Sequence, residues 1–144
     1  PHRHEVFLKK KKITFINDSK ATSFVSTKYA LKNNKNIFWI FGGLPKTGDK
    51  FNLKGVSSNV IKAFIIGKKT TYFRHQLKEK IKYKISFNLK NAIKDIFKQL
   101  LLTRNINATV LFSPASASYD QFNNFVDRGN QFKKITKYYV KKFL

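Results

Sequence analysis

Cysteine and methionine are both missing from the 144 residues of this chain. Without cysteine the chain forms no disulfide and no cysteine-ligated zinc site, and such a composition fits a reducing compartment, so we expect a cytoplasmic protein. The chain begins at Pro1 and has no initiator methionine, so we expect it to be a piece of a longer polypeptide. Because no stretch approaches roughly 18 uninterrupted apolar residues, we expect no membrane span and no membrane partner.

Acidic residues are scarce as well. Asp and Glu number 7 against 30 Lys and Arg, which gives a formal net charge of +23. Such a charge is the usual electrostatic signature of a nucleic-acid-binding protein. The lysines are spread along the whole chain, however, without an Arg-rich block, an aromatic-basic RNA motif or a Cys/His finger spacing. Compositional drift therefore explains the charge better, with only non-specific nucleic-acid contacts expected, and a basic nucleic-acid-binding module stays as the alternative hypothesis.

Apolar residues are plentiful enough for a folded core, at 42% of the chain with 15% aromatics. The length fits one domain, spanning residues 1–144. Apolar runs predict strands at Val6–Leu8, Ile13–Ile16, Ile37–Phe41, Lys62–Ile66, Tyr83–Phe87 and Thr109–Phe112. Helical spacing predicts helices at Ser23–Leu31, Tyr72–Lys80 and Leu89–Leu101, a short helix within Leu53–Asn59, and a last helix toward the C-terminus.

Strands that alternate with helices predict a mainly parallel sheet with helices on both faces. The expected fold class is therefore a Rossmann-like, doubly wound α/β domain. No G-x-G-x-x-G motif follows the first core strand, so the fold by itself assigns no dinucleotide and no chemistry. Ligands of such sheets bind beyond the carboxyl ends of the strands, which directs attention to three strand-to-helix loops.

The first loop is "NDSKAT", Asn17–Thr22. We expect backbone N–H groups near Lys20 to point outward at a helix N-terminus, where the ammonium of Lys20 and the hydroxyl of Thr22 complete an anion site. The structural alternative is plain helix capping by Asp18 or Ser19. A lysine at a helix start opposes the macrodipole, and this mismatch favours an anionic ligand.

The second loop is "GGLPKTGDK", Gly42–Lys50, directly after a predicted core strand. Paired glycines let the backbone turn tightly or approach a ligand closely, and Lys46 follows within reach. The loop does not form a Walker A motif. An ordinary surface loop with one more lysine is the alternative interpretation.

The third loop opens the stretch "SPASASYDQFNNFVDRGNQF", Ser113–Phe132, which has one arginine and no lysine. Ser118 and Gln121 fit the S-x-x-Q capping box of a helix start. The small residues before Ser118 leave the backbone open to a ligand, whereas Phe122 and Phe125 are expected in the core. We attribute the lack of lysine to competition, because further cations here would compete with Lys20 and Lys46 for a carboxylate of the ligand.

Together the loops suit a ligand with more than one anionic oxygen group. No nucleophile–base pair is visible, and the three histidines show no metal-ligand spacing beyond a weak H-x-H at the start of the chain, so no metal site is expected. These features indicate a binding half-site.

The segments "PHRHEV", "NDSKAT", "GGLPK" and "SPASASYDQFNNFVDRGNQF" resemble, in this order and spacing, the C-terminal domain of the Mur ligases, the ATP-dependent ligases of peptidoglycan synthesis. The resemblance covers essentially the whole chain and is strongest to the branch that adds D-glutamate. Other Mur ligases and folylpolyglutamate synthase share the domain architecture and stay open as alternatives.

The resemblance implies roles for individual positions. Thr22, Lys46 and Ser118 would hold the two carboxylates of D-glutamate, with backbone groups near Tyr119 and Phe125 assisting.

Arg3 and Asp18 would reach ATP across a domain interface, and Lys20 would act as the catalytic residue near the phosphates and the incoming amino acid. The family's P-loop, Mg²⁺ ligands and binding site for UDP-N-acetylmuramoyl-L-alanine belong to a central ATPase domain and an N-terminal UDP-binding domain, and none is present in this chain. The resemblance thus implies a bacterial cytoplasmic, monomeric ligase, of which this domain alone is inactive.

Overall fold

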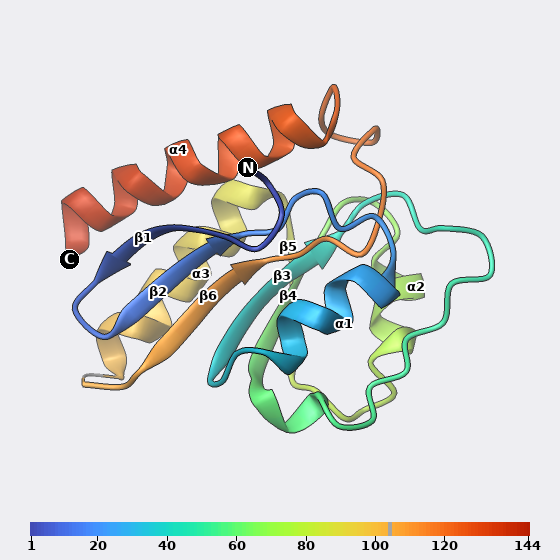
Figure 1. Ribbon diagram of the computed structural model, residues 1–144, viewed down its shortest axis with the longest axis horizontal. Coiled ribbons are helices and arrows are strands. Elements are labelled where there is room, and N and C mark those ends of the chain that lie inside the picture. The colour runs from blue at the N-terminus through green and yellow to red at the C-terminus, as the bar shows by residue number, and fades with distance from the viewer. Residues whose placement is uncertain (104) are drawn as a thin grey trace.

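Six strands form one sheet in the order β1-β2-β6-β3-β4-β5 (Figure 1). The computed structural model describes residues 1–103 and 105–144. β1 runs antiparallel to β2, and all other neighbouring strands are parallel. The strands are β1 (Glu5–Lys10), β2 (Ile13–Asn17), β3 (Ile37–Gly42), β4 (Val60–Ile66), β5 (Tyr83–Phe87) and β6 (Ala108–Phe112). The predicted mainly parallel sheet is confirmed.

Helices cover both faces of this sheet. They are α1 (Phe24–Lys32), α2 (Thr70–Gln76), α3 (Leu89–Leu102) and α4 (Phe125–Phe143), with a 3₁₀ turn η1 (Ser57–Asn59). α1 lies in front of the sheet and α3 behind it in the view of Figure 1. The Rossmann-like α/β class is therefore confirmed. None of the helices within the described residues is long and apolar enough to cross a membrane.

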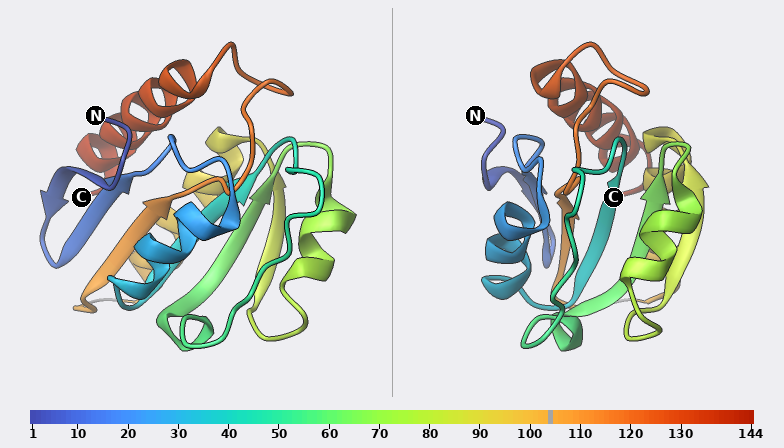
Figure 2. Two further views of the ribbon diagram at one scale, coloured as in Figure 1. Left: turned by 45° about the vertical axis from the view of Figure 1, so that its right-hand side comes forward. Right: turned by 90° about the vertical axis from the view of Figure 1, so that its right-hand side faces the viewer.

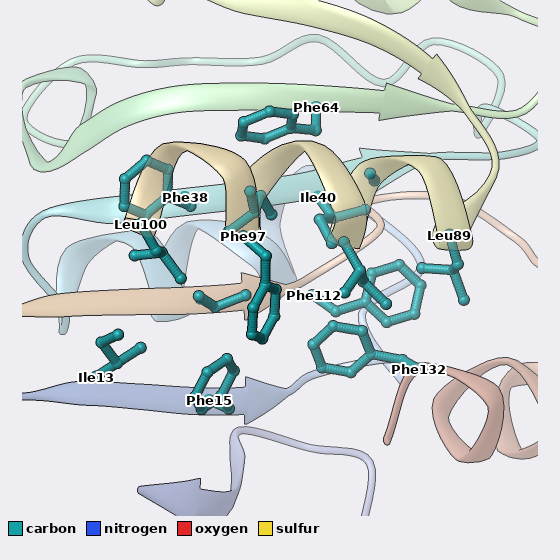
Figure 3. Close-up of a cluster of buried hydrophobic side chains, with 14 of the residues drawn as sticks. Ile13, Phe15, Phe38, Ile40, Phe64, Leu89, Phe97, Leu100, Phe112 and Phe132 are labelled. Atoms are coloured by element: carbon teal, nitrogen blue, oxygen red, sulfur yellow. The ribbon is translucent and has the colours of Figure 1, made fainter. Parts of the chain in front are cut away.

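The central strand β3 is buried along its whole length, as its continuous apolar run predicts. Alternate side chains enter two cores. Phe38 and Ile40 pack with Phe97 of α3 on one face, in the cluster drawn in Figure 3. Trp39 and Phe41 pack on the other face against residues of α1 and α2. Burial on both faces explains why this strand carries no polar position.

Two predicted helices are shorter than expected. The helix predicted for Tyr72–Lys80 ends early, because Lys78 and Glu79 have φ values of 51° and 60°, which a right-handed helix does not contain. Of the helix predicted within Leu53–Asn59, one 3₁₀ turn forms.

β3 ends at Gly42, whose backbone only glycine tolerates. Its φ is +130°, and a Cβ there would collide with the backbone carbonyl of Ile66 on β4. Gly48, farther along the same loop, has φ +78° but nothing within 4 Å of its Cβ position. A side chain at Gly48 would therefore meet backbone strain alone, whereas one at Gly42 would meet both strain and a collision.

We expect Gly42→Ala to lower the free energy of unfolding by more than about 3 kcal/mol, since strain and overpacking add. Gly48→Ala is the matched control and should cost about 1 kcal/mol, from strain alone. Chemical denaturation of both variants measures the difference. Equal losses would show that the approach to β4 contributes nothing.

Candidate functional site

Three loops meet at the carboxyl ends of β2, β3 and β6, as Figure 2 shows for the segments that follow these strands. The 42–50 loop and the 113–124 loop are joined through their backbones. Gly42 N donates to Pro114 O at 3.0 Å, and Leu44 and Ala117 exchange two hydrogen bonds of 3.1 and 2.9 Å. The Ser116 hydroxyl donates to Gly42 O at 2.6 Å. The predicted convergence of these two loops is confirmed.

The 17–22 loop joins the same group through Asp18. The Ser113 hydroxyl, at the end of β6, donates to Asp18 Oδ2 at 2.6 Å and also hydrogen-bonds to the hydroxyl of Thr27 on α1 at 2.8 Å. The backbone N–H of His4 donates to Asp18 Oδ1 at 2.9 Å. Asp18 is thus fixed from two directions and is only 5% exposed.

Arg128, in the first turns of α4, ties the 17–22 loop to the 113–124 loop. Its Nη2 donates to Ser19 O at 2.6 Å, its Nε to Ser19 Oγ at 3.0 Å and its Nη1 to Ser116 O at 3.0 Å. The Ser19 hydroxyl in turn donates to Phe125 O at 2.7 Å. With 1% of its surface exposed, Arg128 holds two loops from the interior of the protein.

Burial lowers the pKa of Arg128 to about 10, and the nearby carboxylate of Asp120 opposes this shift. The guanidinium therefore keeps its charge at neutral pH. Asp120 Oδ2 is buried without a hydrogen-bond partner among the described residues. The guanidinium carbon also lies 5.9 Å from the centre of the Phe112 ring, in a cation–π arrangement.

The first residues of the chain lie against the 17–22 loop. Lys20 N donates to His2 O at 2.8 Å, and Asn17 Nδ2 lies 2.8 Å from His2 Nδ1. Burial by itself would raise the pKa of Glu5, but hydrogen bonds from His2 N, Lys133 and Asn17 outweigh it and lower that pKa to about 2. The segment that carries Arg3 is therefore anchored on both sides.

A cleft of about 470 Å³ opens between this segment, the 17–22 loop and α1. Its volume is in the range of small-molecule sites. The residues that line it are Arg3, His4, Asp18, Lys20, Ala21, Ser26 and Tyr29. All three positions that the resemblance assigns to ATP are therefore brought together.

The cleft has the chemistry of an anion site with one acceptor. Arg3 and Lys20 are exposed cations, whereas Asp18 is a buried carboxylate. Burial raises the pKa of Asp18, although the hydrogen bonds from Ser113 and His4 and the charge of Arg3 counteract the shift. Tyr29 presents an exposed ring, set edge-on to the His4 ring at 5.9 Å. Phosphate, a hydroxyl group and a flat ring would each find a partner here.

The residues assigned to D-glutamate lie outside the lining of this cleft. Thr22 and Lys46 are exposed, Ser118 is buried, Tyr119 is exposed and Phe125 is partly buried. Thr22 and Lys46 come from loops that are in contact through α1.

The 42–50 loop contacts the start of α1, directly after the 17–22 loop, through a carboxylate of the chain itself. Asp49 Oδ2 accepts a hydrogen bond of 2.8 Å from Phe24 N, the first residue of α1, and Asp49 O accepts another from the Tyr72 hydroxyl at 2.6 Å. Asp49 thereby takes part of the anion position that the sequence reserves for an external ligand at this helix start.

At the start of α1, both the alternative of capping by Asp18 or Ser19 and the expectation of free N–H groups near Lys20 are wrong. The helix begins at Phe24 with Ser23 as its cap, so neither Asp18 nor Ser19 caps it. Lys20 N is not free for an anion either, because it donates to His2 O. What Lys20 offers a ligand is its exposed ammonium group, 5.9 Å from the centre of the Phe125 ring.

The capping box predicted at Ser118 is also wrong. α4 begins at Phe125, and Asn124 is its cap, with Asn124 Oδ1 accepting from Asp127 N at 2.8 Å. Ser118 instead closes a turn through its carbonyl, and Gln121 Nε2 donates to Phe87 O at 2.7 Å. The N–H groups of α4 therefore do not surround Ser118.

Burial gives a simpler reason for the lack of lysine in the first part of the third loop. Residues 113–116 and Ser118 are all buried, so a lysine there would lose its hydration. Arg128, the lone cation of the stretch, is the functional position that the sequence reasoning missed. Its isolation in a segment otherwise free of basic residues is the signal that could have found it.

Comparison with known proteins finds relatives that match nearly the whole chain. No protein-family profile matches it. It is 38% identical over 134 residues to a UDP-N-acetylmuramoylalanine–D-glutamate ligase of Wolbachia sp. subsp. Brugia malayi, which is 93% of this chain and 27% of the relative. The ligase of the same name from Nitrobacter winogradskyi is 38% identical over 136 residues, 94% of the chain and 29% of the relative. That of Fusobacterium nucleatum is 38% identical over 140 residues, 93% and 32%.

The resemblance to the D-glutamate-adding Mur ligases is confirmed. The chain spans less than a third of the length of these relatives. Among the described residues, no group of three or more His, Asp or Glu side chains is placed to hold a metal ion.

We expect Arg128→Gln to lower the free energy of unfolding by about 3 kcal/mol, because two buried carbonyls lose a charged donor. Arg74→Gln is the matched control, since Arg74 is an exposed arginine of α2 and should change stability by less than about 0.5 kcal/mol. Urea denaturation compares the two. Similar small effects would mean that the tie between the loops is dispensable.

We expect Asp18→Asn to unfold no more easily than the parent chain at neutral pH. An asparagine keeps both hydrogen bonds, with its carbonyl toward His4 N and its amide toward Ser113, and removes a buried charge. Because the pKa of Asp18 is raised on folding, the native state takes up the proton first, and the cost of the carboxylate disappears as the pH falls toward 3.8. The advantage of the variant should therefore shrink on acidification, which denaturation at several pH values measures. A variant that is less stable at neutral pH would contradict this.

Proposed function

We propose that this chain is the D-glutamate-binding, C-terminal domain of an ATP-dependent ligase that adds D-glutamate to UDP-N-acetylmuramoyl-L-alanine in bacterial peptidoglycan synthesis. The observation that carries the proposal is the cleft, in which Arg3, Asp18 and Lys20 come together beside the interlocked 42–50 and 113–124 loops. The names of the relatives support the choice of amino acid.

The cleft takes the nucleotide in this proposal. Arg3 and Lys20 supply positive charge for phosphate groups, and a carboxylate such as Asp18 accepts hydrogen bonds from ribose hydroxyls. Asp18 already accepts from Ser113 and His4, which fixes its orientation before a ligand arrives. Tyr29 provides an exposed ring at the wall of the cleft.

D-Glutamate binds next to the cleft, where two carboxylates need cations and hydroxyl donors. Lys46 would pair with one carboxylate, and the hydroxyls of Thr22 and Ser118 would donate to the two, with backbone groups near Tyr119 and Phe125. Because Lys46 and Thr22 are exposed in this chain, the amino-acid site is only half built. Closure onto a second domain would complete it and exclude water.

The reaction forms an amide bond at the expense of ATP. The carboxylate of UDP-N-acetylmuramoyl-L-alanine takes the γ-phosphoryl group of ATP, which releases ADP, and the amine of D-glutamate then attacks the acyl phosphate. The tetrahedral intermediate then releases inorganic phosphate, and the amine loses a proton. In this proposal the ammonium of Lys20 would stabilise negative charge on the phosphoryl group, and Lys46 would hold the nucleophile.

The rest of the catalytic machinery would belong to other domains of a cytoplasmic, monomeric enzyme. The P-loop and the Mg²⁺ ligands are assigned to a central domain, and no metal is proposed on this chain. A few charge-assisted hydrogen bonds of about 1.5–3 kcal/mol each offset an association cost of about 4–15 kcal/mol only narrowly. The isolated domain should therefore bind D-glutamate at millimolar concentrations or above and catalyse nothing.

In the full-length ligase we expect Lys46→Ala to raise the KM for D-glutamate at least about tenfold, because one charge-assisted hydrogen bond is worth about 1.5–3 kcal/mol. The KM for ATP should stay unchanged. Steady-state kinetics with each substrate varied in turn separates the two effects.

Lys50→Ala is the matched control, because Lys50 is an exposed lysine at the end of the same loop and has no assigned role. It should leave both KM values as they are. An unchanged KM for D-glutamate in Lys46→Ala, or the same increase in both variants, would remove Lys46 from the site and with it the proposed amino-acid pocket.

A further inference from the structure

α3 and α4 lie side by side on one face of the sheet, and a groove of about 970 Å³ runs between their outer surfaces. Its apolar lining consists of Phe97, Leu101, Ile135, Tyr138, Tyr139 and Phe143. Several of these side chains remain open to solvent, with Tyr138 59% and Leu101 43% exposed. These side chains form one hollowed strip rather than the single scattered apolar residues that are normal on a protein surface.

Lysines follow both sides of the groove. Lys90, Lys94 and Lys98 rise from α3, and Lys134 and Lys142 rise from α4. Lysines four residues apart on one helix face repel each other and weaken the helix. None of the described residues that line the groove is acidic, so this repulsion is not relieved from within it.

The acidic residues of the two helices are engaged elsewhere. Asp95, the one acidic residue of α3, accepts from Lys84 Nζ at 2.9 Å and from Ser86 Oγ at 3.1 Å, on the side of β5. Asp127, the one acidic residue of α4, accepts from Asn123 N and Gln131 at the start of the helix. The lysine rows are therefore left for a negative partner.

The shape of the groove and the packing of its rings narrow the kind of partner. The centre of the Tyr139 ring lies 5.6 Å from that of Phe97 and 5.8 Å from that of Phe143. The rings of Tyr138 and Tyr139 are set edge-on to each other, with their centres 5.4 Å apart. Tyr139 is packed among other rings, and Lys142 Nζ lies over the Tyr138 ring, 5.8 Å from its centre, so neither ring offers the two free faces between which nucleic-acid bases would stack. A hollow between two helices also fits a cylinder better than the flat surface of a membrane.

We propose that this groove, lined by α3 and α4, binds an amphipathic helix with acidic flanks from a partner protein. The apolar stripe of such a helix would contact the aromatic floor, and its two acidic edges would meet the two lysine rows. α3 has 14 residues and is about 21 Å long, so a partner helix of about four turns fills the groove. The inference is independent of the proposed ligase activity, since the nucleotide cleft lies beside α1, on the opposite face of the sheet.

The test uses the full-length protein and a synthetic probe, at physiological salt. The probe is a fluorescein-labelled 18-residue helical peptide with leucines at i, i+3, i+4 and i+7 spacing and glutamates on both flanks. Two comparison peptides replace either the leucines by serine or the glutamates by lysine. Fluorescence anisotropy should detect binding of the first peptide alone. Equal binding of the leucine-free peptide would overturn the proposal, because charge alone would then explain it.

Paired variants separate the groove from the general positive charge. Lys94→Glu/Lys134→Glu changes the rim, and Lys137→Glu/Lys141→Glu makes the same charge change at exposed lysines outside the groove. The first pair should weaken peptide binding at least about tenfold more than the second.

A third comparison tests the apolar floor. Tyr138→Ser should weaken binding about tenfold, whereas Leu102→Ser, at a residue that is 86% exposed and does not line the groove, should not. Equal effects of the two charge pairs, or of the two serine variants, would overturn the groove as the site. So would anionic vesicles or oligo-dT that bind with the same dependence on the rim pair while the peptide does not bind.

Discussion

The buried guanidinium of Arg128 is the interaction on which the carboxyl edge of the sheet depends. From the start of α4 it holds Ser19 and Ser116, and these belong to loops that follow different strands. A buried arginine is stable only while all its donors have partners, so the loops and the helix must order together. The hydrogen bond from Ser113 to Asp18 joins the same two loops at this edge.

One part of the site is already formed and another part is open to solvent. This difference fits a domain that works by closing onto another. The cleft beside Asp18 is formed, with its carboxylate oriented by two internal donors. Thr22 and Lys46, by contrast, stand in solvent on a loop edge. In the proposed ligase, a formed nucleotide side and an open amino-acid side would let one substrate bind first and leave the second site to be completed by a facing domain.

The sequence predicted the sheet well because burial leaves a direct mark on composition. β3 is buried on both faces and reads as one apolar run, and the loops at its end follow from strand direction. Helix starts were predicted less well, because several side chains competed for each cap. Ser118 has the right spacing, but the chain turns there and Asn124 caps α4 instead. Asp49 reaches α1 from 25 residues away, and no local pattern reveals such a partner.

If the edge that carries the exposed Thr22 and Lys46 and the buried Ser118 recognises D-glutamate, the amino acid must perturb all three residues when it binds. An NMR titration of the isotope-labelled chain with D-glutamate, and with L-glutamate for comparison, tests it most directly. We expect saturable shifts at the amides of these three residues, at millimolar concentrations and larger for the D-isomer. Shifts confined to scattered surface lysines, or identical for both isomers, would contradict it.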